Sequence, residues 1–68
     1  MKLQFKRGEL NGEYFDTTGK YKIEKTIHGD WFLYKKSVGH WLWCIDSDVK
    51  YELVKWANND NEYYINSK

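Results

Sequence analysis

Few residues of this 68-residue chain carry side chains that could do chemistry. The set from which a metal site or a reactive pair could be built is His28, His40, Cys44 and Asp46. Their spacing matches no recognised zinc motif, such as a closely spaced cysteine pair or two histidines one helical turn apart. Cys44 and His40 would share one face of a strand, but no third residue is implied that would orient the histidine. We therefore expect no catalytic residue, no metal and no cofactor, and predict that the chain is not an enzyme.

Aromatic and basic residues offer a different chemistry, that of a binding surface. Aromatic residues make up 19% of the chain, which has 4 Trp and a net charge of +1. Such side chains can anchor a protein partner, and when lysines alternate with them they can also stack on bases and hold phosphates. The candidate partner-binding residues are Phe32, Tyr34, Lys35, Lys36, Trp41 and Trp43. The candidate nucleic-acid contacts are Lys22, Lys25, Lys35 and Lys36.

Three strands must position these residues. Aromatic and β-branched residues suit a half-buried strand, and Ser37-Val38-Gly39 provides a three-residue turn, so residues 31–45 predict an antiparallel hairpin. A hairpin alone is marginally stable in water. Residues 20–25 alternate between apolar and polar side chains and should pair with it. We therefore predict a three-stranded antiparallel sheet within residues 20–46.

The N-terminal segment, residues 1–19, predicts an additional strand or hairpin. Residues 2–6 alternate in the same way and indicate an edge strand. Asn11-Gly12 suits a tight turn, and a second short strand at residues 13–16 is the natural continuation. The alternative is that Tyr14 and Phe15 pack from a loop instead of a regular strand.

The spacing of the apolar residues changes after Ile45 from that of a strand to that of a helix. Residues 46–48 are all competent helix caps, and the apolar residues that follow recur with the spacing of one helical face: Val49, Leu53, Trp56 and Ala57. This predicts a helix over residues 48–57. The Asn-rich stretch at residues 58–61 favours turns and should end the helix. Residues 58–68 then form a tail, in which residues 62–65 could add a last short strand.

Together these elements predict an α+β fold in a single domain, residues 1–68. It consists of a small antiparallel β-meander of three to five strands, with one C-terminal amphipathic helix packed on one face. If the helix covers the face that carries Tyr21, Ile23, Trp31 and Leu33, four aromatic residues lie together on the opposite face: Phe32, Tyr34, Trp41 and Trp43. That face could be open, or the N-terminal segment could fold back over it through Leu3, Phe5, Leu10, Tyr14 and Phe15.

From Tyr21 to Asn59 the order of three strands and a helix resembles AP2-type DNA-binding domains and the arm-binding domains of phage and transposon integrases. The resemblance rests on Tyr21, Gly29-Asp30-Trp31, Trp41-Leu42, Asp46-Ser47 and Ala57. The pattern is also similar to that of many small phage and prophage proteins. In the DNA-binding members the outward sheet face carries several arginines and enters the major groove. The one arginine here is Arg7, outside the matching segment.

These observations favour a small non-enzymatic binding module. It would be an accessory protein of a phage or mobile element that docks on a larger host protein or complex through its aromatic sheet face. The alternative is a nucleic-acid-binding domain that uses the same face, with lysines on phosphates. A homo-oligomer that buries this face is a third reading. No apolar run approaches the ~20 residues that span a bilayer, so we expect no membrane association. The single Cys fits a cytoplasmic setting, the host cytosol for a phage protein.

Overall fold

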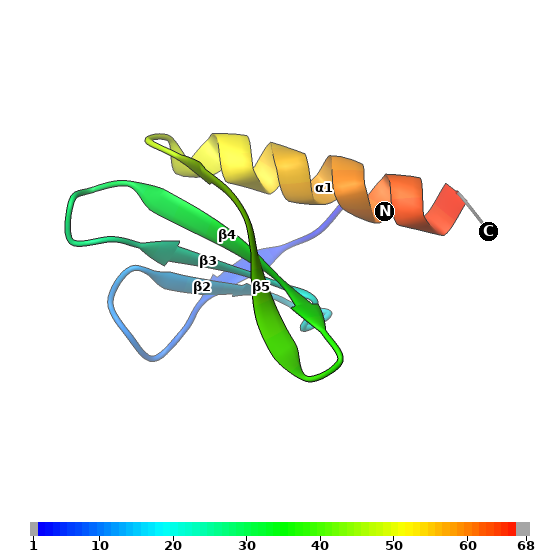
Figure 1. Ribbon diagram of the computed structural model, residues 1–68, viewed down its shortest axis with the longest axis horizontal. Coiled ribbons are helices and arrows are strands. Elements are labelled where there is room, and N and C mark those ends of the chain that lie inside the picture. Colours follow the sequence, from blue (N-terminus) through cyan, green and yellow to red (C-terminus); the bar gives the residue numbers. More distant parts are fainter. Residues whose placement is uncertain (1, 67–68) are drawn as a thin grey trace.

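The computed structural model describes residues 2–66, whose backbone forms five strands followed by one helix (Figure 1). The elements are β1 (Phe5–Arg7), β2 (Glu13–Asp16), β3 (Tyr21–Lys25), β4 (Trp31–Ser37), β5 (His40–Ser47) and α1 (Lys50–Asn66). All neighbouring strands are antiparallel and the spatial order is β1-β2-β3-β4-β5. The predicted α+β meander with a C-terminal helix is therefore confirmed.

The N-terminal segment extends the sheet and does not cover it. Residues 13–16 form β2, which pairs with β3, and β1 pairs with β2 at the sheet edge. The edge strand begins at Phe5, later than the predicted residues 2–6, because Leu3 leaves the sheet plane. Its backbone N–H donates to Asn58 Oδ1 of α1 at 2.6 Å, and its side chain is buried in the core. The alternative in which this segment folds back over the aromatic face is not observed, and its Phe15 instead contacts Trp41 from within the sheet.

A buried carboxylate organises the turn between β2 and β3. Asp16 is 3% exposed, and its oxygens accept hydrogen bonds from the backbone N–H groups of Thr18, Lys20 and Tyr21 and from the Thr18 hydroxyl. Where the chain reverses direction, backbone N–H groups have no partner on a neighbouring strand. The carboxylate accepts their hydrogen bonds instead. The bonds to Tyr21 and Lys20 also fix where β3 begins.

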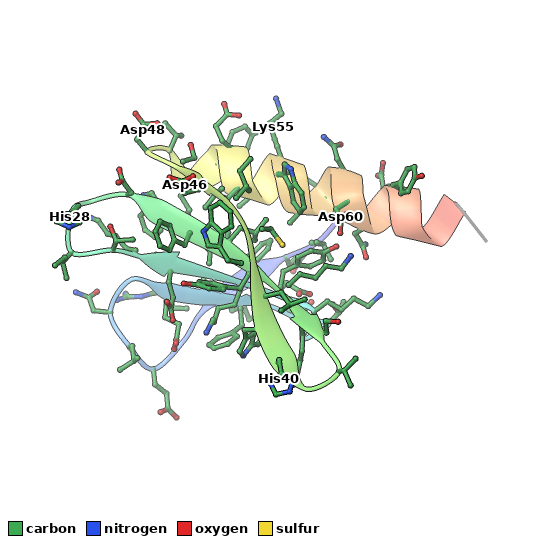
Figure 2. The ribbon with its side chains drawn as sticks, viewed as in Figure 1. His28, His40, Asp46, Asp48, Lys55 and Asp60 are labelled. Atoms are coloured by element: carbon green, nitrogen blue, oxygen red, sulfur yellow. The ribbon has the colours of Figure 1, made fainter. Side chains whose placement is uncertain are left out.

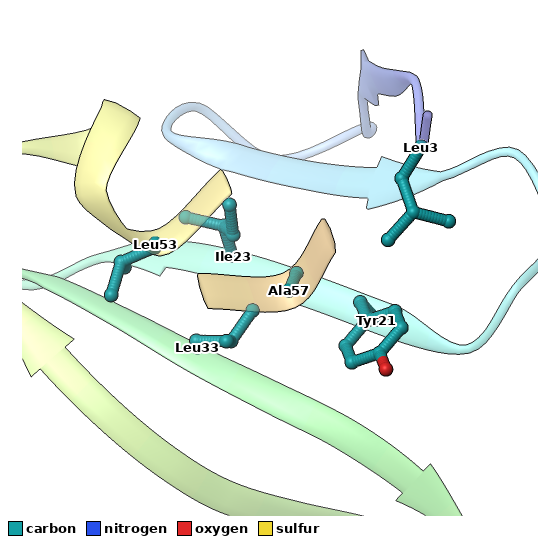
Figure 3. Close-up of a cluster of buried hydrophobic side chains, with 6 residues drawn as sticks. All are labelled: Leu3, Tyr21, Ile23, Leu33, Leu53 and Ala57. Carbon is teal, nitrogen blue, oxygen red and sulfur yellow. The ribbon is translucent and has the colours of Figure 1, made fainter. Parts of the chain in front are cut away.

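The core lies between α1 and one face of the sheet (Figure 3). Its buried apolar members are Leu3, Tyr21, Ile23, Leu33, Leu53 and Ala57. Leu53 and Ala57 are one helical turn apart, so α1 presents one stripe to the sheet. The helix contacts β3, β4 and β5, which places its long axis over the C-terminal three strands of the meander (Figure 1).

The predicted helix bounds are corrected at both ends. The helix begins at Lys50, so Val49 precedes it and is 48% exposed, outside the core stripe. The predicted end at residues 58–61 is wrong, because α1 continues to Asn66 and residues 62–65 are helical instead of a strand. Residues 67 and 68 of the predicted tail lie outside the described residues.

Tertiary contacts explain why an Asn-rich stretch stays helical. Asn58 Oδ1 accepts the Leu3 N–H, Asp60 accepts bonds from two residues of the sheet, and Asn61 is buried. Within the helix, Asn58 Nδ2 also donates to the Val54 carbonyl. Helix propensity differs between residues by only about 0.7 kcal/mol, so several such bonds outweigh it.

Candidate binding face

Strand register separates the residues of the sheet into two faces. The inner face, toward α1, contains the central row Tyr14, Ile23, Leu33 and Ile45, in which each residue pairs with the next. The outer face has its own central row of paired residues, running across all five strands: Lys6, Phe15, Lys22, Tyr34 and Trp43. Within residues 2–66, no helix packs on the outer face, since the helix contacts belong to the inner one. The β1–β2 loop reaches the margin of this face, where Gly8 lies against the side chains of Glu13 and Phe15.

Five aromatic residues lie on the outer face in two ring-contact groups joined through Lys22, and are here called the outer aromatic cluster: Phe15, Phe32, Tyr34, Trp41 and Trp43. The Phe32 ring lies 6.4 Å from Tyr34 and 6.3 Å from Trp43, both edge-on, and Phe15 lies 6.1 Å from Trp41. Such edge-to-face contacts add about 0.5–1.5 kcal/mol beyond area burial. Four of the rings are half-buried by one another, while Trp43 is 55% exposed. The four predicted aromatic anchors are therefore together, and Phe15 joins them.

Lys22 lies inside this cluster. Its Nζ is 5.0 Å from the ring centroids of both Tyr34 and Trp41, and 3.4 Å from a Glu24 carboxylate oxygen. The side chain is only 15% exposed, so the ammonium group is held by aromatic faces and one carboxylate. Partial burial, aided by the charge of Glu24, raises the pKa of Tyr34. Lys22 therefore lies between the Tyr34 and Trp41 rings in the middle of the cluster.

Charge on the outer face is divided between its two ends. One row across the strands holds acidic residues with a single aromatic: Glu13, Glu24, Phe32 and Asp46. Glu13 and Glu24 are directly opposite each other, a like-charge pair that opposes folding. The other end carries Lys36, which pairs with Trp41 and has its Nζ 5.7 Å from that ring. The aromatic cluster thus lies between an acidic end and a basic end.

Two of the lysines predicted for this site lie on the other face. Lys35 pairs with Tyr21 on the inner side, and its Nζ donates to Asp60 of α1 at 2.8 Å. Lys25 pairs with Trp31, and its Nζ lies 5.5 Å from that ring. Trp31 packs against the core, so Lys25 also belongs to the helix side. Of the predicted lysines, Lys22 and Lys36 are on the outer face.

An irregularity in the β4–β5 pairing places the two tryptophans. Leu33 pairs with Ile45 whereas Tyr34 pairs with Trp43, so Cys44 is an extra residue, a β-bulge. Strict alternation would put Trp43 and Ile45 on one face. The bulge instead turns Ile45 and Cys44 toward the core, and partial burial raises the pKa of the Cys44 thiol. Nothing in the sequence marks this bulge, and it was not predicted.

The residues considered for metal or nucleophile chemistry are not assembled into a site. His28 lies in the turn between β3 and β4, and His40 begins β5 at the opposite end of the sheet (Figure 2). In the described part of the chain, no three His, Cys, Asp or Glu side chains gather where they could hold a metal ion. Cys44 has its Sγ 3.6 Å from the Leu42 carbonyl oxygen.

Comparisons with protein-family models, with curated proteins and with solved structures found no match to this chain. None of the helical segments in residues 2–66 is long and apolar enough to cross a bilayer. Function is therefore inferred from the outer face itself.

Proposed function

We propose that this chain is a small non-enzymatic binding module that docks on a larger protein through the outer face of its sheet. The observation that carries the proposal is the outer aromatic cluster, which α1 leaves uncovered and whose Trp43 is 55% exposed. A domain of this size needs its aromatic residues for its core, yet these five lie outside it. Clustered exposed aromatics are typical of interaction sites, and Trp and Tyr are the commonest anchors.

The division of charge favours a protein partner over a nucleic acid. Only Lys22 and Lys36 of the four candidate phosphate contacts lie beside rings of the outer aromatic cluster, and Lys22 is already paired with Glu24. The acidic row at the other end would repel phosphates. Arg7 pairs with Tyr14, in the row of the inner face. The role as an accessory protein of a phage or mobile element is part of the same proposal and draws on the resemblance of residues 21–59.

The test is retention of a partner by the tagged protein from a lysate of cells that carry the gene, with and without nuclease. We expect a discrete protein that survives nuclease and is lost with a Trp41→Ala/Trp43→Ala double variant. The matched control is Tyr51→Ala/Tyr63→Ala, which removes two aromatic side chains that are 64% and 74% exposed on α1. Near-UV circular dichroism checks that both variants are folded.

Two results would contradict the proposal. Retention that disappears with nuclease would support the nucleic-acid alternative, in which affinity also falls steeply with salt. Recovery of the chain alone, with a sedimentation mass above that of a monomer, would support a homo-oligomer that buries the outer face.

A further inference from the structure

The turn between β4 and β5 holds an aliphatic residue in a backbone conformation that suits glycine or asparagine. The turn has two residues, Val38 and Gly39, not the three predicted, and their φ angles are 48° and 80°. Positive φ at both positions is the type I′ geometry, for which Asn-Gly is the preferred sequence. Val38 is the one non-glycine residue with positive φ in the described part of the chain. For a β-branched side chain this conformation is strained.

No contact within the fold compensates for this strain. The Val38 side chain is 94% exposed. Ile27, in the β3–β4 turn at the other end of the sheet, is equally exposed at 96% but has no positive φ. Exposure of an aliphatic residue is thus not unusual here, whereas strain together with exposure is. The two-residue turn requires positive φ at this position but does not require a valine, and a strained residue without a packing contact points to a functional contact.

The surroundings of Val38 are basic. Lys36 lies two residues before it on the outer face, and the Lys36 backbone N–H donates to the Lys20 carbonyl at 2.8 Å, so the two lysines flank the same end of the sheet. Both side chains are exposed, and neither has a carboxylate within ion-pair distance among residues 2–66. Trp41, next to Lys36 across the strands, links this end to the outer aromatic cluster.

We propose that Val38 inserts into an apolar site on the protein partner and that the partner surface around this site is acidic, facing Lys20 and Lys36. The inference rests on the proposed function and extends its surface from the aromatic cluster to the turn. Charge complementarity selects an acidic partner. A valine side chain cannot stack on bases or hydrogen-bond to them, which favours a protein over a nucleic acid.

Two substitutions separate strain from contact. Val38→Thr keeps the branched shape and the strain but replaces a methyl group with a hydroxyl, so Tm should stay within about 1 °C. Val38→Asn relieves the strain and should raise Tm by about 4 °C. Both make the tip of the side chain more polar. Ile27→Thr is the matched control, because it also replaces an exposed β-branched aliphatic residue with threonine, at the opposite turn.

The binding probe is a display library of random peptides selected on the immobilised wild-type protein. We expect the selected peptides to be enriched in Asp and Glu together with apolar residues. Their affinity should fall about tenfold with Val38→Thr and with Val38→Asn, because a buried methyl contact is lost and a polar group takes its place. Lys36→Glu should weaken binding most at low salt. Ile27→Thr should bind as wild type.

The results distinguish this inference from the proposed function. Peptides that lose binding with Trp43→Ala but not with Val38→Thr would leave the docking face standing and overturn the role of Val38. Peptides insensitive to both variants would overturn both. Selected peptides without acidic enrichment, a library without binders, or a single-stranded oligo(dT) bound more tightly than any peptide would each overturn the inference.

Discussion

The Tyr21 hydroxyl donates to Asp60 Oδ2 at 2.5 Å, and Lys35 Nζ donates to the same oxygen at 2.8 Å. One carboxylate of α1 is thus held by two neighbouring strands. Burial acts to raise the pKa of Asp60, but the bonds from Lys35 and Tyr21 and the lysine charge outweigh it, and the pKa lies below its ordinary 3.8. Burial, together with the bond to Asp60, raises the pKa of Tyr21. The fold therefore fixes the second half of α1 at this point.

Asp60→Asn should lower the free energy of unfolding by about 1–2 kcal/mol at pH 7, because it removes a charged acceptor from a partly exposed site. Since the folded pKa of Asp60 is lowered, its contribution is fully present above the unfolded pKa near 4 and is lost as pH falls through the folded value. Urea unfolding at pH 7 and at pH 3 measures both effects. The difference between wild type and variant should shrink at pH 3, and a constant difference would show that the ionised carboxylate is not involved.

Asp16→Ala should be among the most damaging substitutions of a polar residue. It removes an acceptor of four hydrogen bonds from a buried turn and leaves backbone donors without partners, at a cost of about 3 kcal/mol. The control is Asp48→Ala, at an exposed position before α1, which should change the free energy of unfolding by less than about 0.5 kcal/mol. Thermal unfolding compares the two. Equal melting temperatures would contradict the role of Asp16.

Leu53 and Trp56 should rank in the reverse of their sizes. Leu53 is 1% exposed and belongs to the core cluster, so Leu53→Ala should cost about 3 kcal/mol. Trp56 is only partly buried at the margin of the core, and Trp56→Ala should cost less, about 1–2 kcal/mol. Chemical denaturation of both variants tests the order. A larger loss for Trp56 would place that residue, and a different face of α1, in the core.

Asn58 and Asn59 are adjacent but should respond oppositely. Asn58→Ala removes the acceptor of the Leu3 N–H and should destabilise the protein by about 1 kcal/mol. Asn59 is exposed, so Asn59→Ala should stabilise it by a few tenths of a kcal/mol through helix propensity alone. Hydrogen exchange at the Leu3 amide provides a local readout. Unchanged protection in Asn58→Ala would contradict the link between the N-terminal segment and the helix.

The parts of this molecule that follow from local pattern were predictable. Alternation of apolar and polar residues in 20–25 and 31–36 predicted β3 and β4. It also placed Ile23 and Leu33 on one face of the sheet and Phe32 and Tyr34 on the other. The features that were missed depend on partners distant in sequence. The helix passes through Asn58 and Asp60 because Leu3, Tyr21 and Lys35 bond them, and no local propensity encodes that.

The candidate site was predictable to the same extent. Phe32, Tyr34, Trp41 and Trp43 lie together as alternation indicated, although the bulge at Cys44 reverses the face of every residue after it. Lys35 was included in the site because it follows Tyr34 in a run of two lysines. In a strand, neighbours in sequence point to opposite faces, so Lys36 reaches the outer face and Lys35 does not. Strict alternation along β4 therefore predicts Lys36 on the outer face and Lys35 on the inner face.

The most direct test of the docking face is site-specific photo-crosslinking. Benzoylphenylalanine placed at Trp43 on the outer face is compared with the same group at Tyr63, which is 74% exposed on α1. Each protein is irradiated in nuclease-treated lysate of cells that carry the gene and examined by mass spectrometry. We predict a discrete protein adduct from position 43 and none from position 63. An adduct from position 63 alone would contradict the account and move the interaction surface to the helix.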